Sequence, residues 1–165
     1  MNPTIPKVTD EWITQNNPCK EAVDWWDKNE RDPLEILKKL IKVKKYSWMN
    51  WFIVRIMTYH DYVSYAVFAA EQVINIYEKK YPDDKRPRQA IEAAKKCIDD
   101  PSEKNKEAAG AAWAAAEAAR AAAEAAWAAT GAAWAAAGAT AEAARAAMQL
   151  KILNYGMKLL EEPNA

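Results

Sequence analysis

One stretch of the chain, residues 108–147, is so rich in alanine that it constrains the fold more than any other feature. In this run, 27 of 40 residues are alanine. Alanine has the highest helix propensity of all residues, so the run is expected to be helical on propensity alone. Its small side chains also let helix axes approach more closely than the usual distance of about 8–10 Å. The run therefore predicts closely packed helices in the C-terminal part of the chain.

The other residues of the run recur with a helical period. From Gly110 to Gly138 nearly all of them are separated by alternating steps of three and four residues. This spacing gathers the large and charged side chains on one side of a helix. We call this set the tryptophan stripe, and its members are Trp113, Glu117, Arg120, Glu124, Trp127 and Trp134.

Two interpretations of the tryptophan stripe remain open. In the first, it is the outer face of the helices, with Glu117, Arg120 and Glu124 forming a ladder of ion pairs. In the second, it lines a groove in which indole rings stack on a flat ligand, and Arg120 or Arg145 meets the phosphate or carboxylate of that ligand. The spacing is the same in both cases, so it does not decide between them.

A break is expected within the alanine-rich part of the chain. A single straight helix over residues 102–160 would be about 90 Å long at 1.5 Å per residue, which is too long for a compact domain. Thr130-Gly131 is the first candidate for the break, because glycine adopts the left-handed conformation that ends many helices. Residues 138–140 are the second candidate, since the three-and-four rhythm changes there.

The rest of the chain carries repeated signals for helix starts. Asn17-Pro18 predicts a helix capped by Asn17, and Asp32-Pro33 predicts another, with Glu35 completing a capping box. Thr58 predicts the start of a long helix over residues 59–80, and Pro87 the start of one that runs to about residue 99. No strand-like alternation is visible in the sequence. We therefore expect an all-α fold, a compact multi-helix bundle with closely packed alanine-rich C-terminal helices.

The chain is short enough to form a single domain. We expect one helical domain over residues 1–165, with a tail at residues 1–8. Residues 9–100 would form a part rich in tryptophan and tyrosine, and residues 101–162 the alanine-rich helices. An alanine face buries little area per residue, so packing against a second copy of the chain would add burial. A homo-oligomer is therefore expected.

Arg55 and His60 are two polar residues that could carry a functional role. Arg55 interrupts the apolar segment of residues 47–57, and it either extends to solvent from the helix edge or forms an ion pair within the core. His60 is the only histidine, and no serine, cysteine or set of metal ligands accompanies it at a catalytic spacing. The sequence therefore predicts no catalytic residue and no metal site.

Composition excludes several classes of function. There are 23 basic and 23 acidic residues, so no overall positive charge favours duplex nucleic acid. Cys19 and Cys97 are far apart and form no CxxC motif, which favours free thiols in a reducing cytosol. Charged residues punctuate the alanine run, and alanine is too weakly apolar to offset them in a membrane. We expect a cytoplasmic protein without a cofactor.

Some segments resemble a known family. Residues 77–94 have the sequence YEKKYPDDKRPRQAIEAA and lead through DPSEKNKEAA into the alanine run; the opening NNPCKEAVDWW also matches. Together they resemble a family of small alanine-rich proteins of phages, prophages and bacteria. More distantly, the chain is similar to an immunity-protein domain of bacterial toxin systems. The resemblance implies a small, non-enzymatic, all-helical protein of phage–host conflict, and it supplies no catalytic residues. If a phage encodes the protein, its place is the cytosol of the host cell.

The charged motif within residues 77–94 has a structural interpretation and a functional one. In the structural interpretation, the chain turns before Pro87, and Asp83, Arg86 and Arg88 pair with neighbouring charges. In the functional one, Arg86 and Arg88 contact a ligand. Both interpretations fit the spacing.

Two hypotheses about function follow from the resemblance and the residues. In the first, the protein is a phage-type anti-defence protein that sequesters a small nucleotide-type immune signal in an aromatic, arginine-lined cleft. In the second, it is an inhibitor or immunity module that blocks a host or toxin protein through its tryptophan-bearing helix face. The candidate ligand-binding residues are Trp113, Arg120, Trp127, Trp134, Arg145, Arg86 and Arg88.

Overall fold

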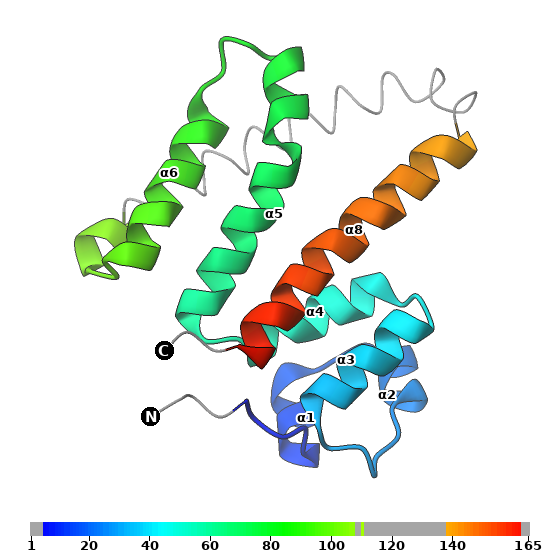
Figure 1. Cartoon of the computed structure of the whole chain (residues 1–165). Coiled ribbons are helices and arrows are strands. Elements are labelled where there is room, and N and C mark those ends of the chain that lie inside the picture. Colours follow the sequence, from blue (N-terminus) through cyan, green and yellow to red (C-terminus); the bar gives the residue numbers. More distant parts are fainter. Residues whose placement is uncertain (1–4, 108–109, 111–137, 163–165) are drawn as a thin grey trace. The chain divides into compact units, whose positions relative to one another are not determined.

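The computed structural model describes residues 5–107, residue 110 and residues 138–162 of the chain (Figure 1). These residues form α-helices and no strands, so the predicted all-α class is confirmed for the part of the chain that is described. The break predicted at Thr130-Gly131 lies outside the described residues. The helices are α1 (Asp10–Asn16), α2 (Lys20–Trp25), α3 (Pro33–Lys42), α4 (Tyr46–Ile56), α5 (Tyr59–Lys80), α6 (Arg86–Asp99) and α8 (Gly138–Glu161).

The chain divides into two compact units. Unit 1 consists of Met1–Tyr62 and Gln149–Ala165, and unit 2 consists of Val63–Met148. Helices α5 and α8 therefore each contribute residues to both units. The single-domain organisation drawn from the sequence stays a prediction.

The core of unit 1 is built from helices that bury one stripe each. In α3 and α4 the buried positions follow the steps of three and four residues typical of an amphipathic helix, and the two helices pack against each other. The C-terminal part of α8 adds buried residues at the same kind of spacing. The buried set is Pro33, Ile36, Leu37 and Leu40 of α3, Met49, Phe52, Ile53 and Ile56 of α4, and Leu153, Met157 and Leu160 of α8.

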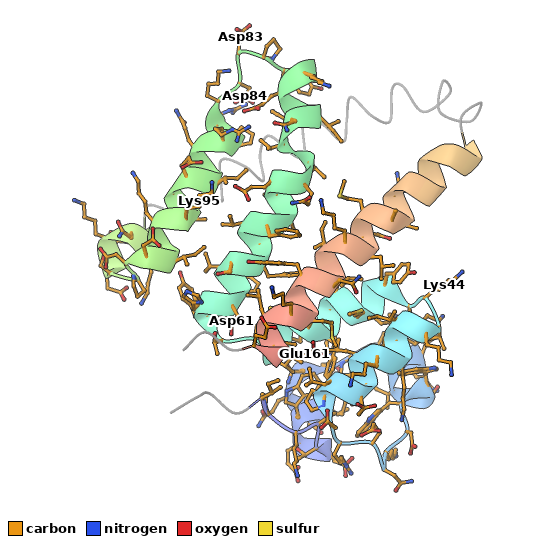
Figure 2. The ribbon with its side chains drawn as sticks, in the orientation of Figure 1. Lys44, Asp61, Asp83, Asp84, Lys95 and Glu161 are labelled. Carbon is orange, nitrogen blue, oxygen red and sulfur yellow. The ribbon has the colours of Figure 1, made fainter. Side chains whose placement is uncertain are left out.

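The end of α8 lies near α3 within this unit. The pKa of Lys38 is raised, first because its ammonium donates a hydrogen bond to Glu35, and to a smaller extent because Glu161 of α8 is close. Figure 2 labels Glu161 at this end of α8. Val8, in the segment predicted as a tail, is only 1% exposed, and its backbone exchanges hydrogen bonds with Arg31.

The start of α3 follows its sequence signal in part. The side chain of Asp32 accepts hydrogen bonds from the backbone N–H groups of Leu34 (2.8 Å) and Glu35 (3.2 Å), and Pro33 occupies the first turn. The expected return bond from Glu35 is replaced, because the N–H of Asp32 donates to Glu30 Oε1 at 3.1 Å. The predicted N-cap, Asp32, is confirmed. The carboxylate that accepts its backbone N–H belongs to Glu30 and not to Glu35.

The prediction that Asn17 caps a following helix is wrong. Asn17 has φ 45 and ends α1, with its N–H donating to the carbonyl of Ile13 at 2.9 Å. Asparagine tolerates this left-handed conformation better than most residues, so it serves at a helix C-terminus as well as at an N-terminus. Helix α2 begins at Lys20, with Cys19 as its N-cap.

The residue Lys44, just after the end of α3, has a left-handed conformation. The N–H of Lys44 donates to Ile41 and that of Lys45 to Leu40, both at 3.0 Å, which is the hydrogen-bond pattern of a Schellman motif. Lys44 has φ 57, at a position that glycine occupies most often. The connection between α3 and α4 therefore holds a lysine where the backbone favours glycine.

The junction of α4 and α5 confirms the predicted start of α5. Thr58 Oγ1 accepts a hydrogen bond from the backbone N–H of Asp61 at 3.1 Å and donates one to Asp61 Oδ2 at 2.7 Å. Asp61 is itself buried and appears at the base of α5 in Figure 2. Arg55 is exposed, and its Nη1 donates to the carbonyl of Trp51, so it extends to solvent and not into the core.

Unit 2 contains a helical hairpin of α5 and α6. Buried Val63, Val67 and Ile74 of α5 meet buried Ile91 and Cys97 of α6, with Ala70, Ala94 and Ile98 packed against them. Two ion pairs join the same helices, Glu71 with Lys95 at 2.8 Å and Glu78 with Arg88 at 2.6 Å. In each helix the paired residues are seven positions apart, so both pairs lie along one side of the hairpin.

Candidate functional site

The residues singled out by sequence for ligand binding are only partly visible. Trp113, Arg120, Trp127 and Trp134 lie outside the described residues. Arg145 is exposed on α8. The remaining two arginines, Arg86 and Arg88, occupy the first turn of α6.

Arg86 is engaged by a carboxylate at the turn between α5 and α6. Its Nε and Nη2 donate to the two oxygens of Asp84 at 2.8 and 2.7 Å, and the hydroxyl of Tyr77 donates to the same carboxylate at 2.7 Å. Arg86, and then Tyr77, hold the pKa of Asp84 well below its usual range. Figure 2 shows Asp84 at this turn. The three side chains form a closed network that fixes the turn.

Arg88 is also held by a carboxylate. Its Nε donates to Glu78 Oε1 at 2.9 Å and its Nη2 to Glu78 Oε2 at 2.6 Å, with Asn75 Oδ1 at 3.5 Å. This hydrogen-bonded pair lowers the pKa of Glu78 and raises that of Arg88. Both arginines therefore make bidentate contacts with carboxylates of this chain. That is the local pairing of the structural interpretation, although Asp84 takes the place expected for Asp83.

Unit 1 contains an apolar pocket that the sequence analysis did not predict. It has a volume of about 250 Å³ and is lined by side chains of α1, α2, α3 and α4 and of the segments that join them. We call it the aromatic pocket, because its lining includes Trp12, Trp25, Trp26, Trp48, Trp51 and Phe52.

The rings of the aromatic pocket pack edge to face. Trp12 of α1 meets Trp51 of α4 at a centroid distance of 6.1 Å and an interplanar angle of 89°, and Phe52 at 5.3 Å and 82°. Trp25 of α2 meets Trp48 of α4 at 6.1 Å and 62°. Such arrangements place the positive edge of one ring against the negative face of another. They attach α1 and α2 to α4 and give the pocket defined walls.

Three cationic side chains lie over tryptophans of the aromatic pocket. The guanidinium carbon of Arg55 is 3.9 Å from the ring centroid of Trp51, and the ammonium of Lys45 is 4.5 Å from that of Trp48. Arg31 lies 5.1 Å over Trp26, whose own indole N–H donates to the carbonyl of Glu30. These are cation–π distances. The pocket thus combines an apolar lining with positive charge against its walls.

The lining of the aromatic pocket is almost entirely apolar. Its polar lining residues are Cys19, an exposed free thiol, and Ser47. Neither residue has a neighbouring base in the described part of the chain that would activate it. Among the described residues, no group of three His, Cys, Asp or Glu side chains could hold a metal ion. The described geometry therefore supports a site that recognises apolar surface.

One signal in the sequence could have pointed to the pocket. Five of the eight tryptophans fall within residues 12–51, and a cluster of large aromatic residues often marks a core or a binding surface. The spacing of these five has no single period. They meet only because three helices pack together.

Comparison with known proteins decides the family. The family described as "Imm-5 like putative immunity protein" matches residues 55–164, which is most of the chain. The chain belongs to this family. The similarity to an immunity-protein domain that the sequence indicated is therefore confirmed. No curated protein matches the chain, and no solved structure matches it.

The family match and the aromatic pocket occupy different parts of the sequence. The pocket is lined by residues between Val8 and Phe52, all of which precede the matched region. The α5–α6 hairpin, by contrast, lies entirely within that region. Membership of the family thus bears on the hairpin and α8, whereas the pocket is a feature of the segment before them. None of the described helices is long and apolar enough to cross a membrane.

Proposed function

We propose that this protein is an immunity module, which binds a toxin protein and blocks its action without catalysing a reaction. The observation that carries the proposal is membership of the immunity-protein family over residues 55–164. An inhibitor of this kind needs a fixed surface, because side chains that are already ordered lose less entropy on binding. The α5–α6 hairpin offers one.

The hairpin is held in place by its own charges. Glu78–Arg88 and Glu71–Lys95 join its two helices, and the Tyr77–Asp84–Arg86 network fixes its turn. Since both arginines of the motif already contact carboxylates, their role in the proposal is to order the surface that meets the toxin.

Unit 2 also exposes apolar side chains that a protein partner would bury. Val73 and Ile76, one turn apart on α5, are 44% and 63% exposed. Exposed apolar side chains that cluster are typical of protein interaction sites. We place the toxin contact on this part of α5 together with the tryptophan stripe, whose residues lie outside those that the structure describes.

Sequestration of a nucleotide-type immune signal is the alternative proposal, with the protein acting in anti-defence for a phage. The richness in aromatic residues and the scattered arginines support it. The arginine pairs with Asp84 and Glu78 favour the immunity module over it, because a phosphate would have to displace a carboxylate from each. Titration calorimetry against cyclic dinucleotides and ADP-ribose derivatives tests the sequestration proposal. Saturable binding of one of these ligands would favour sequestration over the immunity module.

Self-association belongs to the same proposal. An alanine-rich helix surface gains burial by packing against a second copy, so we expect a homo-oligomer. Light scattering on the purified chain measures its mass in solution. A monomer mass over a wide concentration range would contradict the expected homo-oligomer.

The immunity function is tested by growth. Toxin genes that neighbour the gene of this chain are expressed in a sensitive cell with and without the chain. We expect one toxin to arrest growth alone and to be harmless when the chain is present. An Ile76→Lys variant should protect less, whereas Lys79→Ala, an exposed change on the same helix, should protect fully. If no neighbouring toxin is neutralised, the immunity function is wrong.

A further inference from the structure

We propose that the aromatic pocket binds a small amphipathic anion. The apolar body of the ligand enters the pocket, and its carboxylate contacts the lysines at the connection between α3 and α4. This function is separate from the proposed immunity function, since every residue that lines the pocket precedes the region matched by the family.

The size and lining of the pocket define the apolar part of the ligand. Protein interiors contain few voids larger than a water molecule, and empty apolar space of about 150 Å³ is enough to bind benzene. At about 250 Å³, the aromatic pocket has room for two fused rings or a chain of medium length. Because indole and phenyl rings form much of its wall, a ligand that fills it would remove a large apolar area from water.

The positive charge beside the pocket defines the polar part of the ligand. Lys42, Lys44 and Lys45 follow one another at the end of α3, and none of them pairs with a carboxylate among the described residues. Their neighbours Lys38 and Lys39, by contrast, pair with Glu35 and Glu30. Lys45 lies against the pocket, since its ammonium is over the ring of Trp48, a wall residue.

The local backbone does not explain why lysines occur at this connection. Lys44 adopts a left-handed conformation with φ 57, and Lys45 is the N-cap residue of α4, where the helix dipole repels positive charge. Figure 2 shows Lys44 extending outward from this connection. An anion beside the ammonium of Lys45, at the wall of the pocket, would gain a charge-assisted contact. These charges select a carboxylate over a neutral or cationic head group.

Binding is tested with three probes that share one chain: decanoate, decanol and decyltrimethylammonium, each below its micellar concentration. Calorimetry on the full chain should show one site for decanoate, with an affinity about tenfold or more above that for decanol, as one charge-assisted contact provides. The cationic probe should bind more weakly than decanol. Equal affinity for decanoate and decanol would overturn the charge recognition, and no binding of any probe would overturn the site.

The location of the bound ligand is tested with a native cysteine of the chain. Cys19 lines the pocket and is exposed, whereas Cys97 is buried, so a thiol reagent should modify Cys19 first. Decanoate should slow this modification in proportion to its occupancy. Unchanged modification at saturating decanoate would place the ligand elsewhere.

Two variants separate the apolar contact from the charge contact. Lys45→Gln should lose most of the preference for decanoate over decanol and keep the affinity for decanol. Ala22→Leu, which places a larger side chain in the pocket lining, should weaken both probes while the far-ultraviolet circular dichroism spectrum is retained. A preference that survives in Lys45→Gln would overturn the role of Lys45. Full binding in Ala22→Leu would overturn the pocket as the site.

Discussion

Lys45 and Trp48 form a cation–π pair across the first turn of α4, with the ammonium 4.5 Å from the ring centroid. The preceding residue, Lys44, closes the Schellman motif at the end of α3 in a left-handed conformation. The connection between α3 and α4 therefore places positive charge beside the aromatic pocket at a cost to local stability.

This cost predicts the effect of Lys44→Gly. Glycine adopts φ 57 without steric penalty, whereas its greater freedom in the unfolded chain opposes part of the gain. We expect the free energy of unfolding to rise by about 0.5–1 kcal/mol, measured by urea denaturation. Lys42→Gly is the control, because residue 42 is helical and the same change there should destabilise. If Lys44→Gly also destabilises, the left-handed residue is not under strain.

The core of unit 1 predicts a large difference between two identical substitutions. Ile53 is 0% exposed in α4, and Ile76 is 63% exposed in α5. Ile53→Ala should lower the free energy of unfolding by about 2–5 kcal/mol, because it leaves a cavity. Ile76→Ala should change it by no more than about 0.5 kcal/mol. Chemical denaturation measures both, and similar losses in the two variants would contradict the assigned burial.

Local signals explain why some helix boundaries followed from the sequence. Thr58 and Asp61 are three residues apart and form the hydrogen bonds of a helix cap with each other. No distant residue is needed for this, so the start of α5 was predictable, and its end at Lys80 was found as well. Asn17 was misassigned because asparagine is favoured at both kinds of helix end. The choice between them depends on where the chain goes next.

The candidate site did not follow from the sequence for a different reason. Trp12, Trp25 and Trp48 lie on three helices, and their separations along the chain match no helical or strand period. The tryptophan stripe, by contrast, has a regular pattern in the sequence, because its residues recur at steps of three and four. Pocket walls that come from several elements are set by tertiary packing, which periodicity does not encode. The pairing of Arg86 and Arg88 could be predicted from the sequence for the opposite reason. Their carboxylate partners lie within one turn of the chain or next to it.

The ion pair between Glu78 and Arg88 predicts a stability effect that depends on pH. Hydrogen bonding to Arg88 lowers the pKa of Glu78 in the folded protein below its ordinary value of 4.5. Its contribution is therefore fully present above that value and is lost as the pH falls through the folded pKa. Glu78→Gln should be less stable than the unsubstituted protein at neutral pH, and the difference should shrink in acid. Melting temperatures across this range measure it, and a difference independent of pH would exclude the ion pair as its source.

Tyr65 predicts a loss of stability in alkali. It is buried in α5, and burial raises its pKa from 10.0 to about 12. Between these values the unfolded chain has released the proton and the folded chain still holds it, so stability falls as the pH rises. Tyrosinate absorbance should show ionisation at high pH to which Tyr65 and Tyr77, whose pKa is also raised, both contribute. Tyr65→Phe should reduce the amplitude of this late step, and an undiminished late step in that variant would contradict the assignment to Tyr65.

The central claim is that this chain neutralises a toxin by binding it. The most direct measurement titrates the purified chain into the purified toxin that it protects against and follows the toxin's activity. An immunity module predicts that activity falls in proportion to added chain and reaches its minimum at a fixed molar ratio, with complex formation by calorimetry at the same ratio. Undiminished toxin activity in a large excess of folded chain would contradict the account.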